Sequence, residues 1–376
     1  MRASGQKAYS VVVVGSGPAG ISTAINLVNL IPGIRDRLIV LEAASHPRKK
    51  VCGGGVSQYA MHFLKQLDMT LDMPTVTVKR ARIVFDAHEY SETVMMQPVE
   101  LRTVMREDFD EALVRRARSL GIEVIEDEPA ISFDFTDDAV VIHAKKRDFT
   151  TAVMVGADGA TSGVRRAMDK PSGTGAPRNL CAAIRFMEEL EGSGNMEHGN
   201  LEAVMDFSCT FRNGVRGYAW SFPVMIQGQA WLNTGVGGFN VSQKKDTSLK
   251  RVLKEFLAAK GISMDVTRLE GHPIRWFLPS SMLSAHRVVL VGDAAGIDPL
   301  WGEGISFSLG YGEVAASAIA HAFQRGDFSF SSYREQLLDH DLGKALMNRL
   351  QLADKLYRSP GSDTVTELFI SVLSHR

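Results

Sequence analysis

Gly15-Ser16-Gly17-Pro18-Ala19-Gly20 follows a run of four valines, Val11–Val14, near the start of this chain of 376 residues. The valines predict a buried strand, and apolar residues at helical spacing after the turn predict a helix over Pro18–Leu30. A glycine turn between a strand and a helix lets backbone N–H groups approach a phosphate closely. This stretch therefore predicts the phosphate-binding turn of a dinucleotide site.

An acidic residue stands where such a site needs one. A second predicted strand, Leu38–Leu41, ends at Glu42, which lies 22 residues after Gly20. A carboxylate at that distance accepts hydrogen bonds from a ribose, and this strand-helix-strand unit opens a doubly wound sheet. The alternative is a structural turn with a coincidental glutamate, and the context favours the dinucleotide site.

Two more glycine-rich turns occur later in the chain. They are Gly156-Ala157-Asp158-Gly159-Ala160 and Gly292-Asp293-Ala294-Ala295-Gly296, and they follow the predicted strands Val153–Val155 and Val288–Val291. Three such turns, spread over most of the chain, predict one long ligand that is contacted at several points. We identify this ligand as FAD.

The later turns each contain an aspartate, which is an unusual neighbour for a phosphate. An ionised carboxylate accepts hydrogen bonds from hydroxyls, so the expected partners of Asp158 and Asp293 are a ribose or a ribityl chain. Each aspartate also stands where a helix N-cap is favoured. The two roles are compatible.

Length, charge and cysteine content narrow the class of protein. At 376 residues, one large or two interleaved domains are expected. The net charge of −1 gives no indication of nucleic-acid binding, and the histidines show no metal-ligand spacing, so no metal is expected. Three cysteines make no even disulfide framework, and neither a signal peptide nor a membrane span is apparent. We expect a cytoplasmic protein, with peripheral contact at the inner face of the membrane left open.

The pattern changes in the middle of the chain. A helix over Glu107–Leu120 and a strand over Ile122–Ile125 still fit the nucleotide unit, but between about 171 and 238 short segments alternate apolar and polar residues. This alternation predicts an antiparallel sheet with one covered face. Its expected strands are Cys181–Glu188, Glu202–Phe211, Gly217–Phe222 and Ala230–Val236.

The predicted fold class is α/β with an α+β insert. A Rossmann-like FAD-binding domain is expected over residues 1–70, 99–170 and 280–330, and an inserted antiparallel-sheet substrate domain over 71–98 and 171–279. Pro171–Pro177 is an expected boundary, Asp246–Lys260 an amphipathic helix, and 331–376 a C-terminal helical segment.

The turn motifs resemble those of a known group of flavoproteins. The first turn, the segment Gly156-Ala157-Asp158-Gly159-Ala160-x-Ser162-x-x-Arg165 and the third turn are similar to the three fingerprints of the para-hydroxybenzoate-hydroxylase fold, over roughly residues 10–325. Arg106-x-x-Phe109-Asp110-x-x-Leu113 also resembles a helix start that contacts FAD in that group. The resemblance implies that Arg106 contacts FAD and that a substrate-binding sheet interrupts one dinucleotide domain. A second Gly-x-Gly-x-x-Gly is absent, so no dedicated NAD(P) domain is expected.

Three further segments resemble the geranylgeranyl reductase family. They are Lys50-Val51-Cys52-Gly53-Gly54-Gly55-Val56-Ser57, Tyr218-Ala219-Trp220-Ser221-Phe222-Pro223 and Pro299-x-x-Gly302-Glu303-Gly304-Ile305. The family reduces isolated C=C bonds of long isoprenoid chains. The resemblance implies an isoprenoid substrate (a prenyl lipid, a prenyl diphosphate or a quinone tail) and an external electron donor, which could be NAD(P)H, ferredoxin or another reduced flavin.

The residue chemistry agrees with this resemblance. In a strand, Tyr218, Trp220 and Phe222 point to one face and form an apolar wall, and Pro223 is expected to end the strand or place it at an edge. Ordinary core packing is the alternative for the three rings. The glycines after Cys52 let the backbone approach a flat flavin ring, although a free cysteine is also commonly a small buried hydrophobe.

The third of these segments is expected to form a turn whose N–H groups begin a helix at Ile305 and face the flavin pyrimidine edge. Glu303 in this turn is either a proton relay or a solvated charge. The expected catalytic residues are Cys52, Tyr218 and Trp220, and the expected substrate contacts are Gly54, Gly55, Tyr218, Trp220 and Phe222. The expected FAD contacts are Gly15, Gly17, Ala19, Gly20, Glu42, Arg106, Asp158, Gly292, Asp293, Gly302, Gly304 and Ile305.

Two other functions compete with this one. An FAD-dependent monooxygenase or halogenase acting on an aromatic substrate is the nearest, but halogenases carry Trp-x-Trp-x-Ile-Pro where this chain has Tyr218 and Phe222. The other is a flavoprotein that binds lipid without turnover, docked by the amphipathic segment Tyr333–Tyr357. In that case the basic residues Arg48, Lys49 and Lys50 would reach a lipid phosphate. Packing of the segment within the molecule, and a solvated basic loop, are the alternatives.

Overall fold

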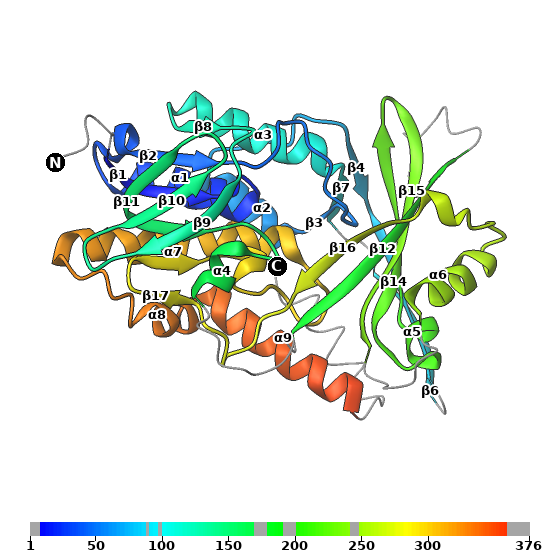
Figure 1. The fold of residues 1–376 in the computed structure, drawn as a ribbon. Coiled ribbons are helices and arrows are strands. Elements are labelled where there is room, and N and C mark those ends of the chain that lie inside the picture. The colour runs from blue at the N-terminus through cyan, green and yellow to red at the C-terminus, as the bar shows by residue number, and fades with distance from the viewer. Residues whose placement is uncertain are drawn as a thin grey trace.

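The computed structural model describes residues 8–87, 90–96, 100–168, 179–190, 201–240 and 248–358. Two main sheets stand side by side, and helices pack against each (Figure 1). Valine-rich strand β1 forms the centre of the first sheet, and its residues Val11–Val13 are fully buried. The parallel strands of this sheet follow the order β18 (Val288–Leu290), β11 (Asp148–Gly156), β1 (Ala8–Val14), β2 (Leu38–Leu41) and β8 (Glu123–Ile125).

Short antiparallel strands complete the first sheet, and three helices flank it. β10 (Val140–Ala144) pairs with β11 and with β9 (Ala130–Phe135), and β17 (Ser284–Ala285) pairs with β18. Small residues bring two of the helices close together, since a Cβ on Gly312 would lie 2.3 Å from Ser22 Oγ. These flanking helices are α1 (Pro18–Leu30), α3 (Arg106–Ser119) and α7 (Gly304–Arg325).

The second sheet confirms the expected alternation in the middle of the chain. Its pairs are antiparallel except β13 with β5, which is parallel. The order is β16 (Glu270–Arg275), β12 (Leu180–Glu189), β15 (Gln229–Asn240), β14 (Val215–Ile226), β13 (Glu202–Asp206), β5 (Arg80–Ala87) and β6 (Tyr90–Met96). A small separate sheet has the order β3 (Gly55–Val56), β7 (Leu101–Val104) and β4 (Thr75–Val78).

Two details differ from the sequence prediction. The strand expected over Glu202–Phe211 ends at Asp206, because Asp206 Oδ1 accepts a hydrogen bond from the Ser208 N–H and helix α5 (Ser208–Arg212) follows. Pro223 neither ends β14 nor lies at a sheet edge. The ladder between β13 and β14 already stops at Ser221, so the N–H that proline lacks is not needed there.

The remaining elements are helical. The amphipathic helix α6 (Leu249–Ala258) turns Val252, Leu253, Phe256 and Leu257 inward. The other helices and single turns are α2 (Gln58–Gln66), α4 (Gly163–Met168), α8 (Tyr333–Asp339), α9 (Asp341–Arg358), η1 (Ile34–Arg37), η2 (Val266–Arg268) and η3 (Gly292–Ala294). Within the described ranges, no helix combines the length and the apolar character that crossing a membrane requires.

Helix α9 connects the two packed regions. Leu342 and Leu346 belong to the core of the first sheet, whereas Ala353 and Leu356 belong to the aromatic core beside the second sheet. The segment Tyr333–Tyr357 therefore buries apolar residues within the molecule, which was the alternative to membrane docking. The expected boundary Pro171–Pro177 lies outside the described residues, and the division into domains stays a prediction.

Candidate cofactor and substrate site

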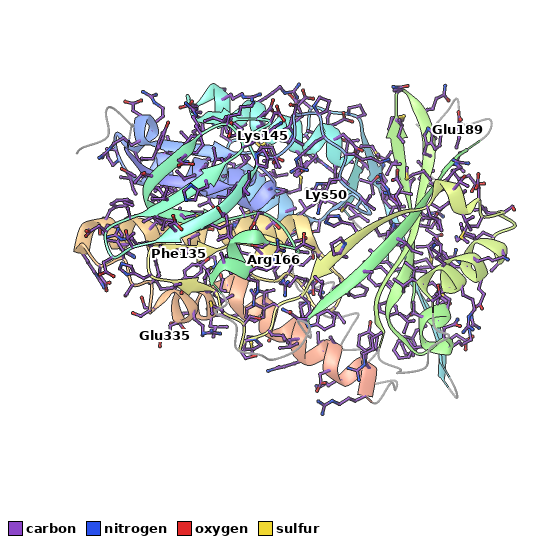
Figure 2. The ribbon with its side chains drawn as sticks, viewed as in Figure 1. Lys50, Phe135, Lys145, Arg166, Glu189 and Glu335 are labelled. Atoms are coloured by element: carbon purple, nitrogen blue, oxygen red, sulfur yellow. The ribbon has the colours of Figure 1, made fainter. Side chains whose placement is uncertain are left out.

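A cavity of about 1000 Å³ is lined by residues of both main sheets. Figure 2 shows another lining residue, Lys50 of the loop after β2, in the middle of the molecule, whereas Glu189 and Glu335 lie at its outer edges. The volume is at the upper end of the roughly 300–1,000 Å³ that small-molecule sites occupy. The predicted site residues that line the cavity are Gly15, Gly17, Ala19, Glu42, Cys52, Gly54, Gly55, Arg106, Asp158, Tyr218, Trp220, Phe222, Asp293, Gly302, Gly304 and Ile305.

Two predicted FAD contacts, Gly20 and Gly292, are absent from this lining. A Cβ on Gly20 would lie 1.9 Å from the Gly15 carbonyl oxygen, and one on Gly292 would lie 2.7 Å from Ala19 Cβ. Both glycines therefore allow backbone segments to pack closely. They shape the first and third turns and do not form the cavity wall.

The first turn presents a helix N-terminus to the cavity. Gly17 is the N-cap of α1 and Pro18 follows it, with no acidic residue in the first turn of the helix. Gly15 has a φ of 108°, and a Cβ there would lie 2.4 Å from the Ala157 carbonyl oxygen, so the first and second glycine turns touch. The unpaired N–H groups and the dipole of α1 favour a negatively charged group such as a diphosphate.

Other backbone segments of the lining face open space. Gly159 and Gly302 have φ values of 80° and 62°, and a Cβ on either would meet no atom within 4 Å. These positions leave room where a bound molecule would approach the backbone. This open backbone fits a dinucleotide, together with the α1 N-terminus and the carboxylate of Glu42.

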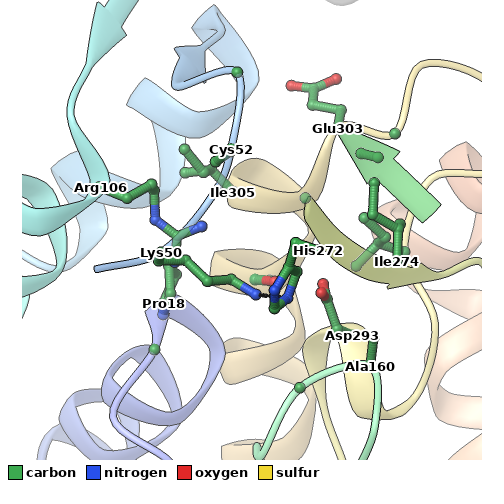
Figure 3. A pocket seen from close by; sticks show the side chains of 18 of the residues that line it. Pro18, Lys50, Cys52, Arg106, Ala160, His272, Ile274, Asp293, Glu303 and Ile305 are labelled. Atoms are coloured by element: carbon green, nitrogen blue, oxygen red, sulfur yellow. Dashed lines mark hydrogen bonds between the residues drawn. The ribbon is translucent and has the colours of Figure 1, made fainter. Parts of the chain in front are cut away.

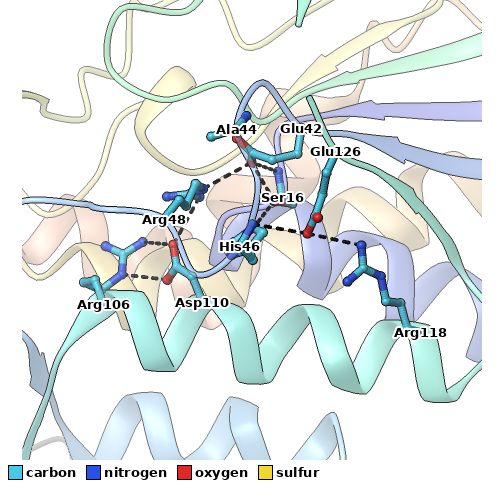
Figure 4. A network of polar contacts seen from close by, with 9 residues as sticks. All are labelled: Ser16, Glu42, Ala44, His46, Arg48, Arg106, Asp110, Arg118 and Glu126. Carbon is cyan, nitrogen blue, oxygen red and sulfur yellow. Dashed lines mark hydrogen bonds and ion pairs between the residues drawn. The ribbon is translucent and has the colours of Figure 1, made fainter. Parts of the chain in front are cut away.

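Glu42 is part of a buried polar network at one end of the cavity (Figure 4). Its carboxylate accepts hydrogen bonds from the Ser16 N–H (3.0 Å) and the Ser16 hydroxyl (2.5 Å). Arg48 Nε lies 3.3 Å from Glu42, and Arg48 Nη2 lies 3.1 Å from Asp110. Burial by itself raises the pKa of Glu42, but Arg48 and Ser16 outweigh it and hold the pKa below its usual value. Glu42 is therefore ionised, as a hydrogen-bond acceptor for a ribose should be.

The three consecutive basic residues have different surroundings. The Arg48 side chain is only 16% exposed because it pairs with Glu42 and Asp110. Lys49 forms an ion pair with Glu270, and Lys50 is hydrogen-bonded to His272 inside the cavity. A solvated basic loop is therefore wrong for Arg48 and Lys50.

Lys50, His272, Arg106 and Asp293 point toward one another in the cavity (Figure 3). Burial, and then the positive charges of Lys50 and Arg106, lower the pKa of His272 to about 3, so its imidazole is neutral. Burial also lowers the pKa of Lys50, against the attraction of Asp293. Sequence reasoning missed His272 because only the fold brings β16 to the loop that carries Lys50.

Arg106 lies beside the cysteine loop. Its guanidinium makes two hydrogen bonds to Asp110, at 2.7 and 2.8 Å, and also interacts with Cys52. Burial opposes the charge, but Asp110 and then Cys52 raise the pKa of Arg106, which stays protonated. The prediction placed Arg106 at the cofactor, and the fold adds that it faces the thiol.

The second-turn aspartate acts as a helix cap. Asp158 accepts hydrogen bonds from the Ser162 hydroxyl (2.5 Å) and from the N–H groups of Gly163 (2.7 Å) and Val164 (3.1 Å). Asp158 therefore caps the first two N–H groups of α4 with its side chain, whereas Ser162, whose hydroxyl accepts the Arg165 N–H at 2.8 Å, stands at the N-cap position. Asp158 also lines the cavity. The cap holds the second turn rigid next to Gly15.

Asn233 joins the cysteine loop to the aromatic wall. Its amide nitrogen donates to the carbonyl oxygens of Cys52 (2.8 Å) and Gly53 (3.2 Å), and its amide oxygen accepts from Trp220 Nε1 (3.3 Å). Arg185 Nη1 also donates to the Cys52 carbonyl at 3.2 Å. Asn233 is fully buried on β15. No sequence signal marked it, since one polar residue in an alternating strand is ordinary.

The three predicted rings form one wall of the cavity and also part of an aromatic core. Trp220 and Phe222 are each 7% exposed, and both lie about 3.4 Å from where a Cβ on Gly53 would stand. The Tyr218 hydroxyl donates to the Trp301 carbonyl at 2.5 Å. Asn233 holds Trp220, the Trp301 carbonyl holds Tyr218, and the Gly53 backbone packs beside two of the rings. The fold itself therefore fixes the shape of the wall.

Acidic and basic groups meet at another part of the lining. Asp298 is 1% exposed, and its carboxylate accepts hydrogen bonds from the Leu300 N–H (2.8 Å) and the Trp301 N–H (3.3 Å). Burial raises the pKa of Asp298 to about 6, with Arg349 opposing and Glu303 adding to the rise. Glu303 accepts hydrogen bonds from the Ser57 and Ser306 hydroxyls, so it is not a solvated charge.

The comparisons with known proteins agree with this geometry. The family model of the FAD binding domain matches residues 8–336. The chain is 29% identical to geranylgeranyl diphosphate reductase of Oryza sativa subsp. japonica, over 84% of this chain and 67% of that protein. It is 27% identical to digeranylgeranylglycerophospholipid reductase 2 of Methanococcoides burtonii, over 92% of this chain and 84% of that protein.

Solved structures share the fold. A geranylgeranyl bacteriochlorophyll reductase-like protein from Thermoplasma acidophilum superposes with a TM-score of 0.76 at 23% identity, covering 94% of this chain and 89% of that one. A mutant halogenase in complex with FAD has a TM-score of 0.68 at 17% identity, over 95% and 77%. At these identities the likeness establishes the fold alone.

The glycine turns, the Glu42 network and the cavity define a flavoprotein. The chain belongs to the FAD binding domain family. It is a flavin-dependent oxidoreductase with FAD as its cofactor, and the predicted similarity to the geranylgeranyl reductases is confirmed.

Proposed function

We propose that this protein reduces C=C bonds of an isoprenoid chain, which is part of a prenyl lipid, a prenyl diphosphate or a quinone. One observation carries the proposal. The aromatic wall of Tyr218, Trp220 and Phe222 meets the glycine loop after Cys52 in the same cavity as the dinucleotide turns. When bound and reduced, FAD supplies the hydride for such a reduction.

The chain's own residues hold the two reactants in this proposal. The α1 N-terminus at Gly17 would bind the diphosphate of FAD, ionised Glu42 would accept hydrogen bonds from its ribose, and Arg106 would contact the cofactor. The further FAD contacts are Gly15, Ala19, Asp158, Asp293, Gly302, Gly304 and Ile305. Gly54 and Gly55 line the cavity beside the aromatic wall and would contact the substrate, and the lack of a Cβ on Gly54 lets the loop pack against the Val104 carbonyl.

The wall binds the apolar chain and excludes water from the reacting carbons. An isolated alkene accepts hydride poorly, so protonation leads or accompanies the transfer and positive charge develops on carbon. The ring faces of Tyr218 and Trp220 stabilise such a charge by roughly 2 kcal/mol in a desolvated site. Cys52, Tyr218 and Trp220 are accordingly the proposed catalytic residues of the wall and the loop.

Electrons and substrate come from outside the chain in this proposal. We infer an external donor, either NAD(P)H, ferredoxin or a reduced flavin, because the chain carries one Gly-x-Gly-x-x-Gly turn. We also include contact with a membrane surface, since long prenyl chains partition into lipid. Monooxygenase or halogenase chemistry on an aromatic ring is the second candidate, because a halogenase shares the fold.

Mass spectrometry of host lipids and quinones, with and without the chain, tests the proposal. We expect one isoprenoid pool to gain two hydrogen atoms per reduced C=C bond when the protein is present. The reduced enzyme should produce the same saturated product without oxygen. The proposal is wrong if no isoprenoid changes, and an oxygen-dependent hydroxylated or halogenated aromatic product would establish the second candidate instead.

A further inference from the structure

Asp298 lines the cavity, and neither the sequence motifs nor the comparisons give it a role. We propose that Asp298 is the proton donor of the C=C reduction, an inference that rests on the proposed function. The argument starts from its position. The carboxyl group is 1% exposed and shares the cavity lining with Tyr218 and Trp220.

The acid and the aromatic wall are fixed to the same residue. The Trp301 N–H donates to Asp298 Oδ2 at 3.3 Å, and the Trp301 carbonyl accepts the Tyr218 hydroxyl at 2.5 Å. The Trp301 ring also contacts the Tyr218 ring edge-on, with their centroids 6.0 Å apart. A prenyl chain lying on the wall therefore shares the cavity with the acid.

Three other cavity carboxylates already have strong partners, and a further one, Asp293, lies with Lys50 and His272. Glu42 is paired with Arg48 and Ser16, Asp158 accepts three hydrogen bonds at the start of α4, and Glu303 accepts two from hydroxyls. Asp298 accepts from two backbone N–H groups, and among the described residues it forms no ion pair within 4.0 Å. A buried carboxyl with so little charge compensation holds its proton to a higher pH than a free aspartate does.

The charged and titratable groups around Asp298 come from three elements. Arg349 and Tyr357 lie on α9, Glu303 caps α7, and Tyr218 lies on β14. Burial raises the pKa of Asp298 most, Arg349 lowers it, and Glu303 raises it further. Substrate that displaces water from the cavity lowers the polarity around Asp298 and so favours the protonated acid.

The atoms and electrons of the step balance. One alkene carbon receives a hydride, with its two electrons, from the cofactor. The external donor supplied these electrons when it reduced the cofactor. At the other carbon a C–H bond forms while the O–H bond of Asp298 breaks. The carboxylate that remains takes a proton from water after the saturated product leaves.

A purely structural role must be separated from this one, because Asp298 also closes the turn to Leu300. Asp298→Asn keeps an acceptor oxygen for that turn and removes the acidic proton. Asp206 makes the same kind of turn, with its Oδ1 2.7 Å from the Ser208 N–H, and does not line the cavity. Asp206→Asn is therefore the matched control.

The experiment mixes reduced holoenzyme anaerobically with three probes and follows the reoxidation of its flavin. The probes are geranylgeranyl diphosphate, digeranylgeranylglyceryl phosphate and menaquinol, whose ring is already reduced and cannot reoxidise the flavin. With the probe that wild type reduces fastest, Asp298→Asn should slow reoxidation by about 100-fold or more, while Asp206→Asn matches wild type. Both variants should bind FAD and accept electrons from dithionite like wild type.

A second readout does not depend on turnover. In oxidised holoenzyme carrying ¹³C-labelled aspartate, the carboxyl signal that Asp298→Asn removes should titrate near pH 6. The rate of flavin reoxidation should fall at high pH with the same apparent pKa as this titration. Arg349→Gln should move both to higher pH, and Glu303→Gln should move both to lower pH.

The outcomes separate the two claims. If wild type reduces a probe and Asp298→Asn does so equally fast, the role of Asp298 is overturned and the proposed function stands. An apparent pKa of reoxidation that does not move in the Arg349 and Glu303 variants also overturns the role. If wild type reduces none of the probes, the proposed function fails, and the role of Asp298 fails with it.

Discussion

Asn233 is the residue on which the aromatic wall and the cysteine loop depend together. It satisfies two backbone carbonyls of the loop and the indole N–H of Trp220, and it is fully buried. Asn233→Ala should lower the free energy of unfolding by about 2 kcal/mol, because these groups lose their partner away from water. Denaturant unfolding and FAD affinity measure the two consequences.

A double-mutant cycle tests whether the effect passes through the ring. Trp220→Phe keeps an aromatic face and removes the N–H, so it should cost less after Asn233→Ala than before it. The expected coupling is about 1 kcal/mol. Strict additivity of the two substitutions would mean that Asn233 supports only the loop.

At the same scale, Asp298 makes stability depend on pH. Its pKa is raised from the ordinary 3.8 to about 6 in the folded protein, so the folded state binds the proton more tightly than the unfolded chain. The stabilisation is fully present below about pH 4 and is lost as the pH rises through about 6. Wild type should therefore lose about 3 kcal/mol relative to Asp298→Asn between pH 4 and pH 7.

Thermal or urea unfolding of both proteins across this range gives the comparison. Asp206→Asn serves again as the control, because it makes the same Asp-to-Asn substitution in a similar turn that does not line the cavity. A difference between wild type and Asp298→Asn that stays constant with pH would show that the buried carboxyl does not hold its proton.

At the scale of elements, the contact between α1 and α7 positions the diphosphate-binding end of α1. A Cβ on Gly312 would lie 2.3 Å from Ser22 Oγ and 2.6 Å from the Ser22 backbone carbonyl carbon. The Ser22 hydroxyl also donates to the Leu309 carbonyl at 2.6 Å, which ties the two helices. There is no room for a methyl group unless the helices separate.

Gly312→Ala sets two effects against each other. Alanine gains about 1 kcal/mol of helix propensity over glycine, but an overpacked helix contact costs about 1–3 kcal/mol. The new methyl group would also clash with the Ser22 backbone, which cannot rotate away as a side chain can. We expect net destabilisation and weaker FAD binding, measured by unfolding and by flavin titration. Gln324→Ala, on the exposed side of the same helix, should leave both unchanged. A more stable Gly312→Ala protein would mean that the two helices adjust easily.

At the scale of the whole molecule, the sequence predicted the features that neighbouring residues determine, but it did not predict those that depend on contacts between distant parts of the chain. The bounds of α1 and β2 agree with the prediction because the turn and the valine and leucine runs determine them locally. The end of β13 was missed because one side chain, Asp206, turns the backbone. His272, Asn233 and Arg349 had no motif, since each gains its role from a partner that lies far away in the chain.

Helix α9 lets the coupling between the two packed regions be measured. Leu346 is buried in the core of the first sheet and Leu356 in the aromatic core, and each is fully inaccessible to solvent. Replacing either by alanine should cost about 3 kcal/mol, the usual effect of a cavity from a buried leucine. Because α9 runs from one region to the other (Figure 1), we expect both variants to shift a single unfolding transition by similar amounts.

The two variants should differ in function although they agree in stability. Leu356 packs in the same core as Trp220 and Trp301, so Leu356→Ala should loosen the wall and weaken isoprenoid binding, with FAD affinity retained. Leu346→Ala should leave isoprenoid binding unchanged at temperatures where it stays folded. Two separate unfolding transitions, each shifted by one variant only, would contradict this and would mean that the regions fold independently and that α9 only connects them.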